Sequence, residues 1–214
     1  MSDISGKLVL IRHGESVANA KNIFTGRSAS PLTRRGEQQM RDLAHHLTLK
    51  GLKPDRCFTS TQERARKSAA ILLKAMSAEN VPTVSSAALD ERDYGALTGL
   101  TKTAAVSKWG EEQVRIWRRS YAIAPPGGES LQETAARVLA FYKQAILPSA
   151  QAGGITLVIA HGNSLRALIS IIEGEKNIDI NNIEIAPGEA IAFLMDGGNA
   201  GRKLLNILPI NPTW

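Results

Sequence analysis

The chain has 214 residues, 43% of them apolar, and carries a net charge of +6 with a sequence pI near 9.6. This length suits one domain with a substantial core, and the positive charge indicates anionic partners such as phosphorylated metabolites, nucleic acid or a membrane surface. No segment approaches the roughly 20 apolar residues of a membrane-spanning helix, and the N-terminal MSDISGK lacks the build of a signal peptide, so we expect a cytoplasmic protein. A single cysteine, Cys57, agrees with a reducing compartment.

The hydrophobic pattern predicts strands that alternate with helices. Two short apolar runs, KLVLI at 7–11 and ITLVIA at 155–160, predict buried strands. The other expected elements are, in chain order, a helix at 32–51 with Thr33 as N-cap, a strand at 55–60, a helix at 61–76 capped by the residues TST, a strand at 82–86, a helix at 129–147 opened by a Ser130 to Glu133 capping box, a helix at 163–174 and a hairpin at 190–208. The alternation predicts an α/β fold, a three-layer sandwich with a mainly parallel central sheet flanked by helices.

The segment at about 86–128 departs from this pattern. It holds LDERDYGALTGL, two short helical pieces around KWGEEQVRIWRRS, and the bend APPGG. We predict that residues 1–214 form one domain and that this segment is an insertion that lies over the edge of the sheet and over the active site.

Both apolar strands end on a histidine and a glycine, RHG at 12–14 and AHG at 160–162. Ligands of open α/β sheets bind at the carboxyl ends of the strands, so two neighbouring parallel strands would bring His13 and His161 into one crevice. The glycines allow close approach of the backbone, and the helix that follows each of them points its free N–H groups at the same place. This arrangement favours an anion.

Other readings of the histidines are weaker. His45 and His46 lie on the first long helix, where we expect structural or solvated residues. A two-histidine metal site at His13 and His161 has no HxH or HExxH spacing to supply further ligands, and nearby arginines would repel a cation. We therefore predict no metal.

Arginines accompany the two histidines from separate parts of the chain. Arg12 precedes His13, Arg64 lies in the first turn of a helix, Arg92 follows Glu91, and WRRS contributes Arg118 and Arg119. A cation in a first helical turn opposes the helix dipole, which is easier to explain if a bound anion offsets the repulsion. Guanidinium groups hold phosphate and carboxylate oxygens in bidentate geometry, so converging arginines predict a small, highly charged anion.

Phosphoryl transfer to or from a hydroxyl also needs a proton carrier. A carboxylate beside bound phosphates holds a proton more readily, because like charges disfavour the ionised form. The residue pattern leaves four candidates open, namely Glu15, Asp90, Glu91 and Asp93.

Five motifs, LVLIRHGES, NIFTG, ERDYGALTGL, WRRS and AHGNSLRAL, resemble those of the cofactor-dependent phosphoglycerate mutases, a branch of the histidine phosphatase superfamily, and occur in the family's order. The resemblance implies that His13 is the nucleophile that becomes phosphohistidine, that Arg12, Arg64 and His161 bind the phosphoryl group, and that Glu91 donates and accepts the proton. The substrate-binding residues predicted with it are Asn19, Thr25, Gly26, Arg92, Tyr94, Lys102, Arg118, Arg119, Gly162 and Asn163.

The implied reaction interconverts 3-phosphoglycerate and 2-phosphoglycerate in glycolysis and gluconeogenesis, with 2,3-bisphosphoglycerate as the phosphoryl primer and no metal. The family also implies a homo-oligomer, a dimer or a tetramer. From the residues themselves we expect no nucleic-acid partner and no membrane partner.

Two features of the chain bear on this expectation. The turn PPGGESL is shorter than in longer family members, and the chain stops at PINPTW, so we predict that water reaches the phosphohistidine and adds a bisphosphatase side reaction. A broad small-molecule phosphatase of the same superfamily is one alternative, although WRRS and Lys102 argue against it. A nucleic-acid binder is another, but aromatic residues make up only 5% of the chain and no stacking array accompanies the basic residues.

Overall fold

A computed structural model of the chain describes residues 4–174, 183–196 and 204–205. It confirms the predicted α/β sandwich, whose central sheet has the strand order β3-β2-β4-β1-β5-β6. The first four strands of that order are parallel to one another, and β5 runs antiparallel to β1. The strands are β1 (Ile4–Arg12), β2 (Arg56–Ser60), β3 (Thr83–Ser86), β4 (Gly154–Ala160), β5 (Ala190–Asp196) and β6 (Leu204–Leu205).

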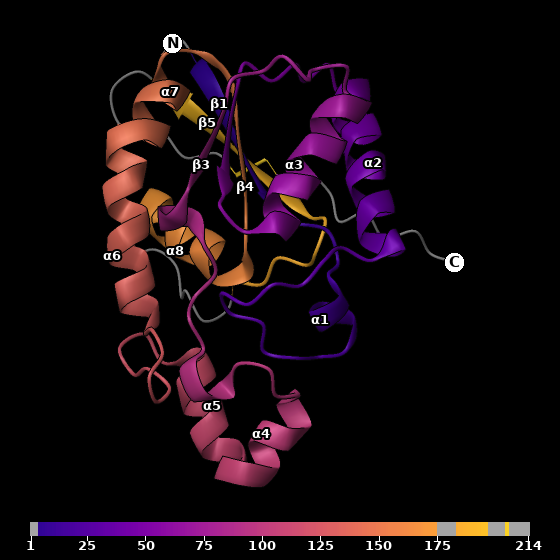
Figure 1. Ribbon diagram of the computed structural model, residues 1–214. Coiled ribbons are helices and arrows are strands. Elements are labelled where there is room, and N and C mark those ends of the chain that lie inside the picture. The colour runs from indigo at the N-terminus through magenta and orange to yellow at the C-terminus, as the bar shows by residue number, and fades with distance from the viewer. Residues whose placement is uncertain (1–3, 175–182, 197–203, 206–214) are drawn as a thin grey trace.

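Helices cover both faces of the sheet (Figure 1). On one face lie α2 (Arg34–Leu49) and α3 (Glu63–Ala75), and on the other α6 (Leu131–Phe141), α7 (Leu147–Gln151) and α8 (Gly162–Glu173). The remaining helices are α1 (Val17–Ala20), α4 (Lys102–Trp109) and α5 (Glu111–Arg119), with the 3₁₀ turns η1 (Ala87–Leu89) and η2 (Gly95–Leu97) and the π-helical turn η3 (Tyr142–Ile146).

The two strands that carry the histidines are buried on both faces, which is why their sequences read as unbroken apolar runs. Along β1, Leu8 and Leu10 pack against α6 and α8, whereas Val9 and Ile11 pack against α2 and α3. None of these four side chains is exposed. The core therefore fixes the carboxyl end of β1 from both sides.

Helix ends match the predicted signals with one exception. Thr33 caps α2, and the Ser130 to Glu133 capping box opens α6. The predicted cap of α3 by the residues TST is wrong, because Gln62 is the N-cap and its side chain makes no capping bond. The hydroxyl of Ser60 accepts from the N–H of Gln62 at 3.1 Å and also contacts Asp90 and His161.

The hairpin predicted at 190–208 is confirmed in its strand pairing, since β5 pairs antiparallel with β6. Its turn lies outside the described residues. The helix predicted at 129–147 continues through η3 into α7, with one π-helical turn that the sequence does not announce.

The segment 86–128 has a small apolar cluster of its own. Leu97, Ala105, Val114 and Trp117 pack together with Phe24. This cluster supports α4 and α5, which lie away from the helices that cover the sheet (Figure 1).

Candidate active site

The two histidines meet as predicted. In the parallel pairing of β1 with β4, Arg12 lies opposite Ala160, so the residues that follow leave the sheet at the same level. The backbone N–H of His13 donates to the carbonyl of Ala160 at 3.0 Å, and the rings of His13 and His161 have centroids 4.9 Å apart. Both side chains are buried, with exposed fractions of 2% and 0%.

His13 is held as a neutral base. Its Nδ1 lies 2.7 Å from the carbonyl oxygen of Gly14. Because a carbonyl can only accept, Nδ1 carries the proton and Nε2 keeps its lone pair. Burial lowers the pKa of His13 well below 6.5, and the charges of Arg12 and Arg64 lower it further. A neutral imidazole with a free Nε2 is the form that attacks phosphorus.

Two glycines seat the loop that follows His13 on the first turn of α2. A Cβ at Gly14 would collide with the carbonyl oxygen of Gly36, and a Cβ at Gly36 would collide with that of Glu15. The loop is fixed further by a hydrogen bond from the Gly14 N–H to the hydroxyl of Ser68, 3.1 Å long. This close packing leaves His13 little freedom to move.

His161 is oriented by a chain of hydrogen bonds from β2. The hydroxyl of Ser60 lies 2.7 Å from Asp90 Oδ1 and 2.8 Å from His161 Nε2. The carboxylate can only accept, so the Ser60 proton points to Asp90, and His161 donates from Nε2. Burial lowers the pKa of His161 well below 6.5, and His13 and Arg64 lower it further, so His161 is a neutral donor.

Arg12 and Arg64 bring positive charge to the histidines. Arg64 is only 3% exposed, and its guanidinium donates to the carbonyls of Gly26 and Ser28 at 2.8 and 3.0 Å. Burial lowers the pKa of Arg64, Glu91 opposes that shift, and Arg12 adds to it. Glu91 and Asp90 are the carboxylates whose charge acts on Arg64, and Asp90 also accepts hydrogen bonds from Ser60 and Thr61, so positive charge remains for a bound anion.

Glu91 is the candidate carboxylate that the structure places beside the histidines. It is 8% exposed, and its Oε1 accepts hydrogen bonds from the backbone and side-chain nitrogens of Asn163, each at 3.1 Å, and from the N–H of Arg92 at 2.8 Å. A Cβ at Gly162 would lie 3.7 Å from Glu91 Oε2. One oxygen is therefore fixed by three donors, and the other lies next to Gly162 in the wall of the cavity.

The other three carboxylates have different partners. Asp90 accepts from Ser60 and Thr61, and Asp93 Oδ1 accepts from the N–H of Gly95 at 2.8 Å. Glu15 lines the cavity but accepts from the hydroxyl of Thr33 at 2.9 Å. The geometry thus favours Glu91 as the proton carrier.

These groups border a cavity of about 660 Å³. Thirteen of the fifteen predicted site residues line it, namely Arg12, His13, Asn19, Thr25, Gly26, Arg64, Glu91, Tyr94, Lys102, Arg118, Arg119, Gly162 and Asn163. His161 lies behind His13, against its ring.

Arg92 is the exception among the predicted substrate contacts. It is fully buried, does not line the cavity, donates from Nη2 to the carbonyl of Trp117 at 3.0 Å, and lies over the ring of Tyr94. These contacts indicate that Arg92 holds the ring of Tyr94 and the C-terminal part of α5 in place. We correct the prediction accordingly.

The outer part of the cavity is rich in cations. Lys102, Arg118 and Arg119 come from α4 and α5, and burial lowers the pKa of Lys102, with the charges of Arg118 and Arg12 acting in the same direction. Arg119 pairs with Glu184 at 2.6 Å. The segment 86–128 therefore supplies three positive groups to one cavity.

The sequence analysis missed Arg166 and the segment 183–189, which also line the cavity. Arg166 lies three residues after Asn163 on α8, and it donates to the side-chain oxygen of Asn163 at 3.3 Å. Residues three apart on a helix lie on the same face, so the helical spacing could have predicted Arg166 at the cavity. The segment 183–189 has no regular pattern, yet Ile185 accepts a hydrogen bond from Arg12 through its carbonyl at 2.6 Å. Nothing in its sequence indicates that contact.

The described residues contain no group of three or more histidine, cysteine, aspartate or glutamate side chains that could hold a metal ion. No helix among them has the length and apolar character needed to cross a membrane.

Comparisons with known proteins agree with this geometry. The histidine phosphatase superfamily (branch 1) matches residues 8–207. A 2,3-bisphosphoglycerate-dependent phosphoglycerate mutase of Xanthobacter autotrophicus is 50% identical over 186 residues, which cover 87% of this chain and 90% of that protein. A protein of the same name from Mesorhizobium japonicum is 45% identical over 193 residues, covering 90% and 94%. Among solved structures, the alpha-ribazole phosphatase of Shigella flexneri is similar with a TM-score of 0.79 at 26% identity, covering 94% of this chain and 96% of that one.

Proposed function

The chain belongs to the histidine phosphatase superfamily and, within it, to the 2,3-bisphosphoglycerate-dependent phosphoglycerate mutases, and we propose that it interconverts 3-phosphoglycerate and 2-phosphoglycerate through a phosphohistidine. The observation that carries the proposal is His13, a buried, neutral imidazole with a free Nε2 in a cavity lined by arginines. A neutral imidazole attacks phosphorus, and the cations around it suit the negative charge of a phosphate ester.

We propose that the inner groups carry out the phosphoryl transfer. Nε2 of His13 attacks phosphorus in line with the departing oxygen. Arg12 and Arg64 donate to the phosphoryl oxygens, on which charge accumulates in the loose transition state. His161, whose Nε2 proton is donated to Ser60, donates to these oxygens from Nδ1 once the charge of the bound phosphoryl group favours a second proton on its ring. Glu91 gives a proton to the departing substrate oxygen and takes one back from the hydroxyl that attacks in the second half of the reaction.

We propose that the outer cations bind the rest of the substrate. Lys102, Arg118 and Arg119 hold the carboxylate and the second phosphate, with Asn19 and Asn163 at the sides. This group and the inner arginines form two cationic regions in one cavity, which fits a primer that carries two phosphates on neighbouring carbons and a carboxylate. 2,3-Bisphosphoglycerate would supply the phosphoryl group that first charges His13. The segment 86–128 acts as a cover, since it provides both Glu91 and the outer cations.

A phosphatase is the second candidate, favoured by the similarity to the alpha-ribazole phosphatase. Water in place of the substrate hydroxyl would release phosphate from phosphohistidine through the same inner groups. We propose that this occurs as a bisphosphatase side reaction beside the mutase reaction.

We also propose a cytoplasmic homo-oligomer that needs no metal and binds neither nucleic acid nor membranes. The buried arginines support metal-free chemistry, because they supply the positive charge that a metal would otherwise bring to the phosphoryl group. The edge strand β3, with Val84 49% exposed, leaves room for contact with a second copy.

The deciding experiment measures formation of 2-phosphoglycerate from 3-phosphoglycerate, with and without 2,3-bisphosphoglycerate and with EDTA present. A rate that rises with the bisphosphate and resists the chelator supports the mutase. Release of phosphate without isomerisation would replace it with the phosphatase.

A further inference from the structure

The proposed proton carrier lies on a segment without regular secondary structure. Glu91 stands between the turns η1 and η2, so no helix or strand fixes its backbone. Proton transfer depends on placement, since a shift of about 1 Å can cost about 10²-fold in rate. The segment must therefore be held from outside, and the described contacts show that α6 holds it.

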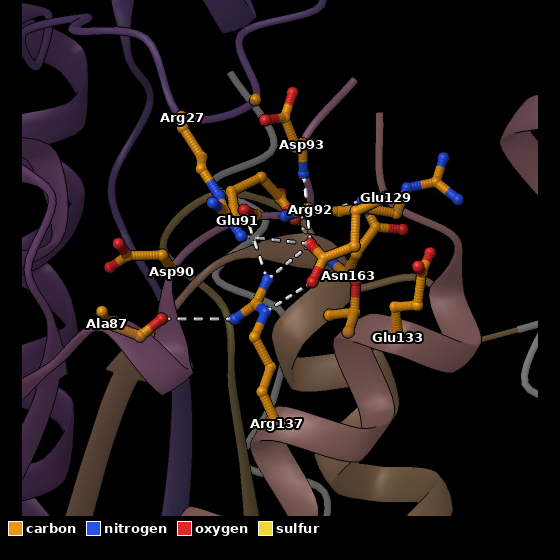
Figure 2. A network of polar contacts seen from close by, with 12 residues as sticks. Arg27, Ala87, Asp90, Glu91, Arg92, Asp93, Glu129, Glu133, Arg137 and Asn163 are labelled. Atoms are coloured by element: carbon orange, nitrogen blue, oxygen red, sulfur yellow. Dashed lines mark hydrogen bonds and ion pairs between the residues drawn. The ribbon is translucent and has the colours of Figure 1, made fainter. Parts of the chain in front are cut away.

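Arg137 of α6 holds the segment on the side that precedes Glu91. Its Nη1 donates to the carbonyl of Ala88 at 2.8 Å and, at 3.4 Å, to that of Ala87. Its Nη2 lies 3.4 Å from the carbonyl oxygen of Glu91 itself. In Figure 2 the guanidinium of Arg137 reaches up from the helix into the centre of this network.

Glu129, just before α6, holds the backbone that follows Glu91 in the chain. Its carboxylate accepts from Arg137 Nε at 2.7 Å and Nη2 at 2.9 Å, a bidentate pair. The same carboxylate accepts from the N–H of Asp93 at 3.3 Å, and the N–H of Glu129 donates to the carbonyl of Asp93 at 2.9 Å. One ion pair thus contacts the backbone on both sides of Glu91.

The network also reaches the loop that holds Arg64. Arg27 lies 3.8 Å from Glu129, and its neighbours Gly26 and Ser28 accept the hydrogen bonds of Arg64. The proton carrier and a phosphoryl-binding arginine are thereby connected through Glu129.

Burial makes this ion pair different from a surface pair. The side chains of Arg137 and Glu129 are 19% and 11% exposed, compared with 63% and 69% for Arg115 and Glu112, which pair with the same bidentate geometry on α5. Burial alone would raise the pKa of Glu129, but the hydrogen bonds and charge of Arg137 hold that pKa below its usual range, so the carboxylate stays ionised. Shielding from water keeps the pair in one geometry.

We propose that Arg137 and Glu129 are positioning residues that set the place of Glu91 for proton transfer. The inference rests on the role proposed above for Glu91. In the step concerned, the bond between phosphorus and the substrate oxygen breaks, a bond between phosphorus and His13 Nε2 forms, and the proton of Glu91 moves to the departing oxygen. Arg137 and Glu129 act through Glu91 and contact neither substrate nor the reacting nitrogen.

The leaving group offers a readout that general damage to the site would not move. An alkoxide such as that of 2,3-bisphosphoglycerate needs the proton as it departs, whereas p-nitrophenolate departs without one. We would measure the rate of His13 phosphorylation in single turnovers at saturating 2,3-bisphosphoglycerate and at saturating p-nitrophenyl phosphate, and take the ratio of the two rates.

Glu91→Gln should lower this ratio about 10²-fold, because it removes the transferable proton. Arg137→Met should lower the ratio about tenfold, because Glu91 keeps its proton but loses its position. The matched control is Arg115→Met, which removes the exposed pair on α5 and should leave the ratio unchanged.

Three results separate the possibilities. If Glu91→Gln lowers the ratio and Arg137→Met does not, or if Arg137→Met slows both donors equally, the positioning role is wrong while the function of Glu91 stands. If Glu91→Gln leaves the ratio unchanged, the proposed role of Glu91 fails and the inference fails with it. If Arg137→Met does not fold, Glu129→Gln, which keeps the size of the side chain, is judged by the same ratio.

Discussion

The inner and outer ends of the cavity are built differently. Inner groups are buried and individually held: His13 is 2% exposed and Arg64 3%, and both are bonded to backbone carbonyls. Outer groups are held more loosely, since the side chain of Arg119 is 34% exposed and that of its partner Glu184 is 75% exposed. The difference indicates that the inner end is organised in advance for the chemical step, and the outer end for selecting and retaining the substrate.

The origin of the difference lies in the fold. The two histidines follow β1 and β4, whose side chains are packed on both faces of the sheet, and Arg64 lies in the first turn of α3, which packs on that sheet. The outer groups belong to α4 and α5, which rest on a small cluster around Leu97 and Trp117. Changes at the inner end should therefore act mainly on kcat, and changes at the outer end mainly on KM.

The largest effect is expected for His13→Ala. Without the nucleophile, phosphoryl transfer should fall by about 10⁴-fold or more, and no phosphoprotein should form from 2,3-bisphosphoglycerate. Rapid-quench labelling with ³²P measures this directly, with His45→Ala on the exposed face of α2 as the control. Retained labelling in His13→Ala would mean that another group accepts the phosphoryl group.

The sequence predicts the inner end well because its signals are periodic and local. Apolar runs predict two buried strands, and parallel strands that end on RHG and AHG must present both histidines at one edge of the sheet. The structure confirms that pairing with Arg12 opposite Ala160. Turn and cap signals such as Thr33 also hold, because they depend on neighbouring residues alone.

The parts of the cavity that do not follow β1 and β4 directly were harder to predict, for physical reasons. A segment without hydrophobic periodicity does not indicate which side chains are buried. Nothing in the sequence therefore indicated that Arg92 is buried against the ring of Tyr94 while its neighbour Glu91 reaches the cavity. The contact of Ile185 with Arg12 joins residues 173 positions apart through a backbone carbonyl, which any residue could supply. The choice of Glu91 among four carboxylates likewise required the fold or the family.

The second-largest effect is expected for Arg64→Lys, which tests whether changes at the inner end act mainly on kcat. Arg64→Lys keeps a positive charge but loses the planar fork that two carbonyls now orient. We expect kcat to fall about 10²-fold, with KM within about threefold of wild type, because the donor matters most in the transition state. Steady-state kinetics with 3-phosphoglycerate test this, and a change confined to KM would contradict the comparison.

The third effect concerns the outer end. Arg118→Met should raise KM for 3-phosphoglycerate about tenfold and leave kcat within about threefold, because one charge-assisted hydrogen bond to the substrate is lost. Arg115→Met, one turn earlier on α5 and exposed, is the matched control. A larger loss in kcat than in KM would place Arg118 with the inner groups.

The smallest effect is a dependence of stability on pH that the buried histidines should cause. Burial is the main reason that the pKa values of His13 and His161 lie well below 6.5, so both stay neutral in the folded chain where an unfolded histidine already binds a proton. Below about pH 6.5 the unfolded state therefore binds more protons, and the free energy of unfolding falls as pH falls.

Each buried histidine should contribute up to about 1.4 kcal/mol per pH unit between pH 6.5 and its own lowered pKa. Urea denaturation at pH 7.5, 6.5 and 5.5 measures the slope, and His161→Gln should reduce the part of the slope that the two histidines cause by about half. Arginines stay charged throughout this range, so Arg118→Met at the outer end should leave the slope unchanged. An unchanged slope in His161→Gln would mean that His161 takes up a proton in the folded state, and would remove the contrast between a neutral inner pair and a cationic outer group.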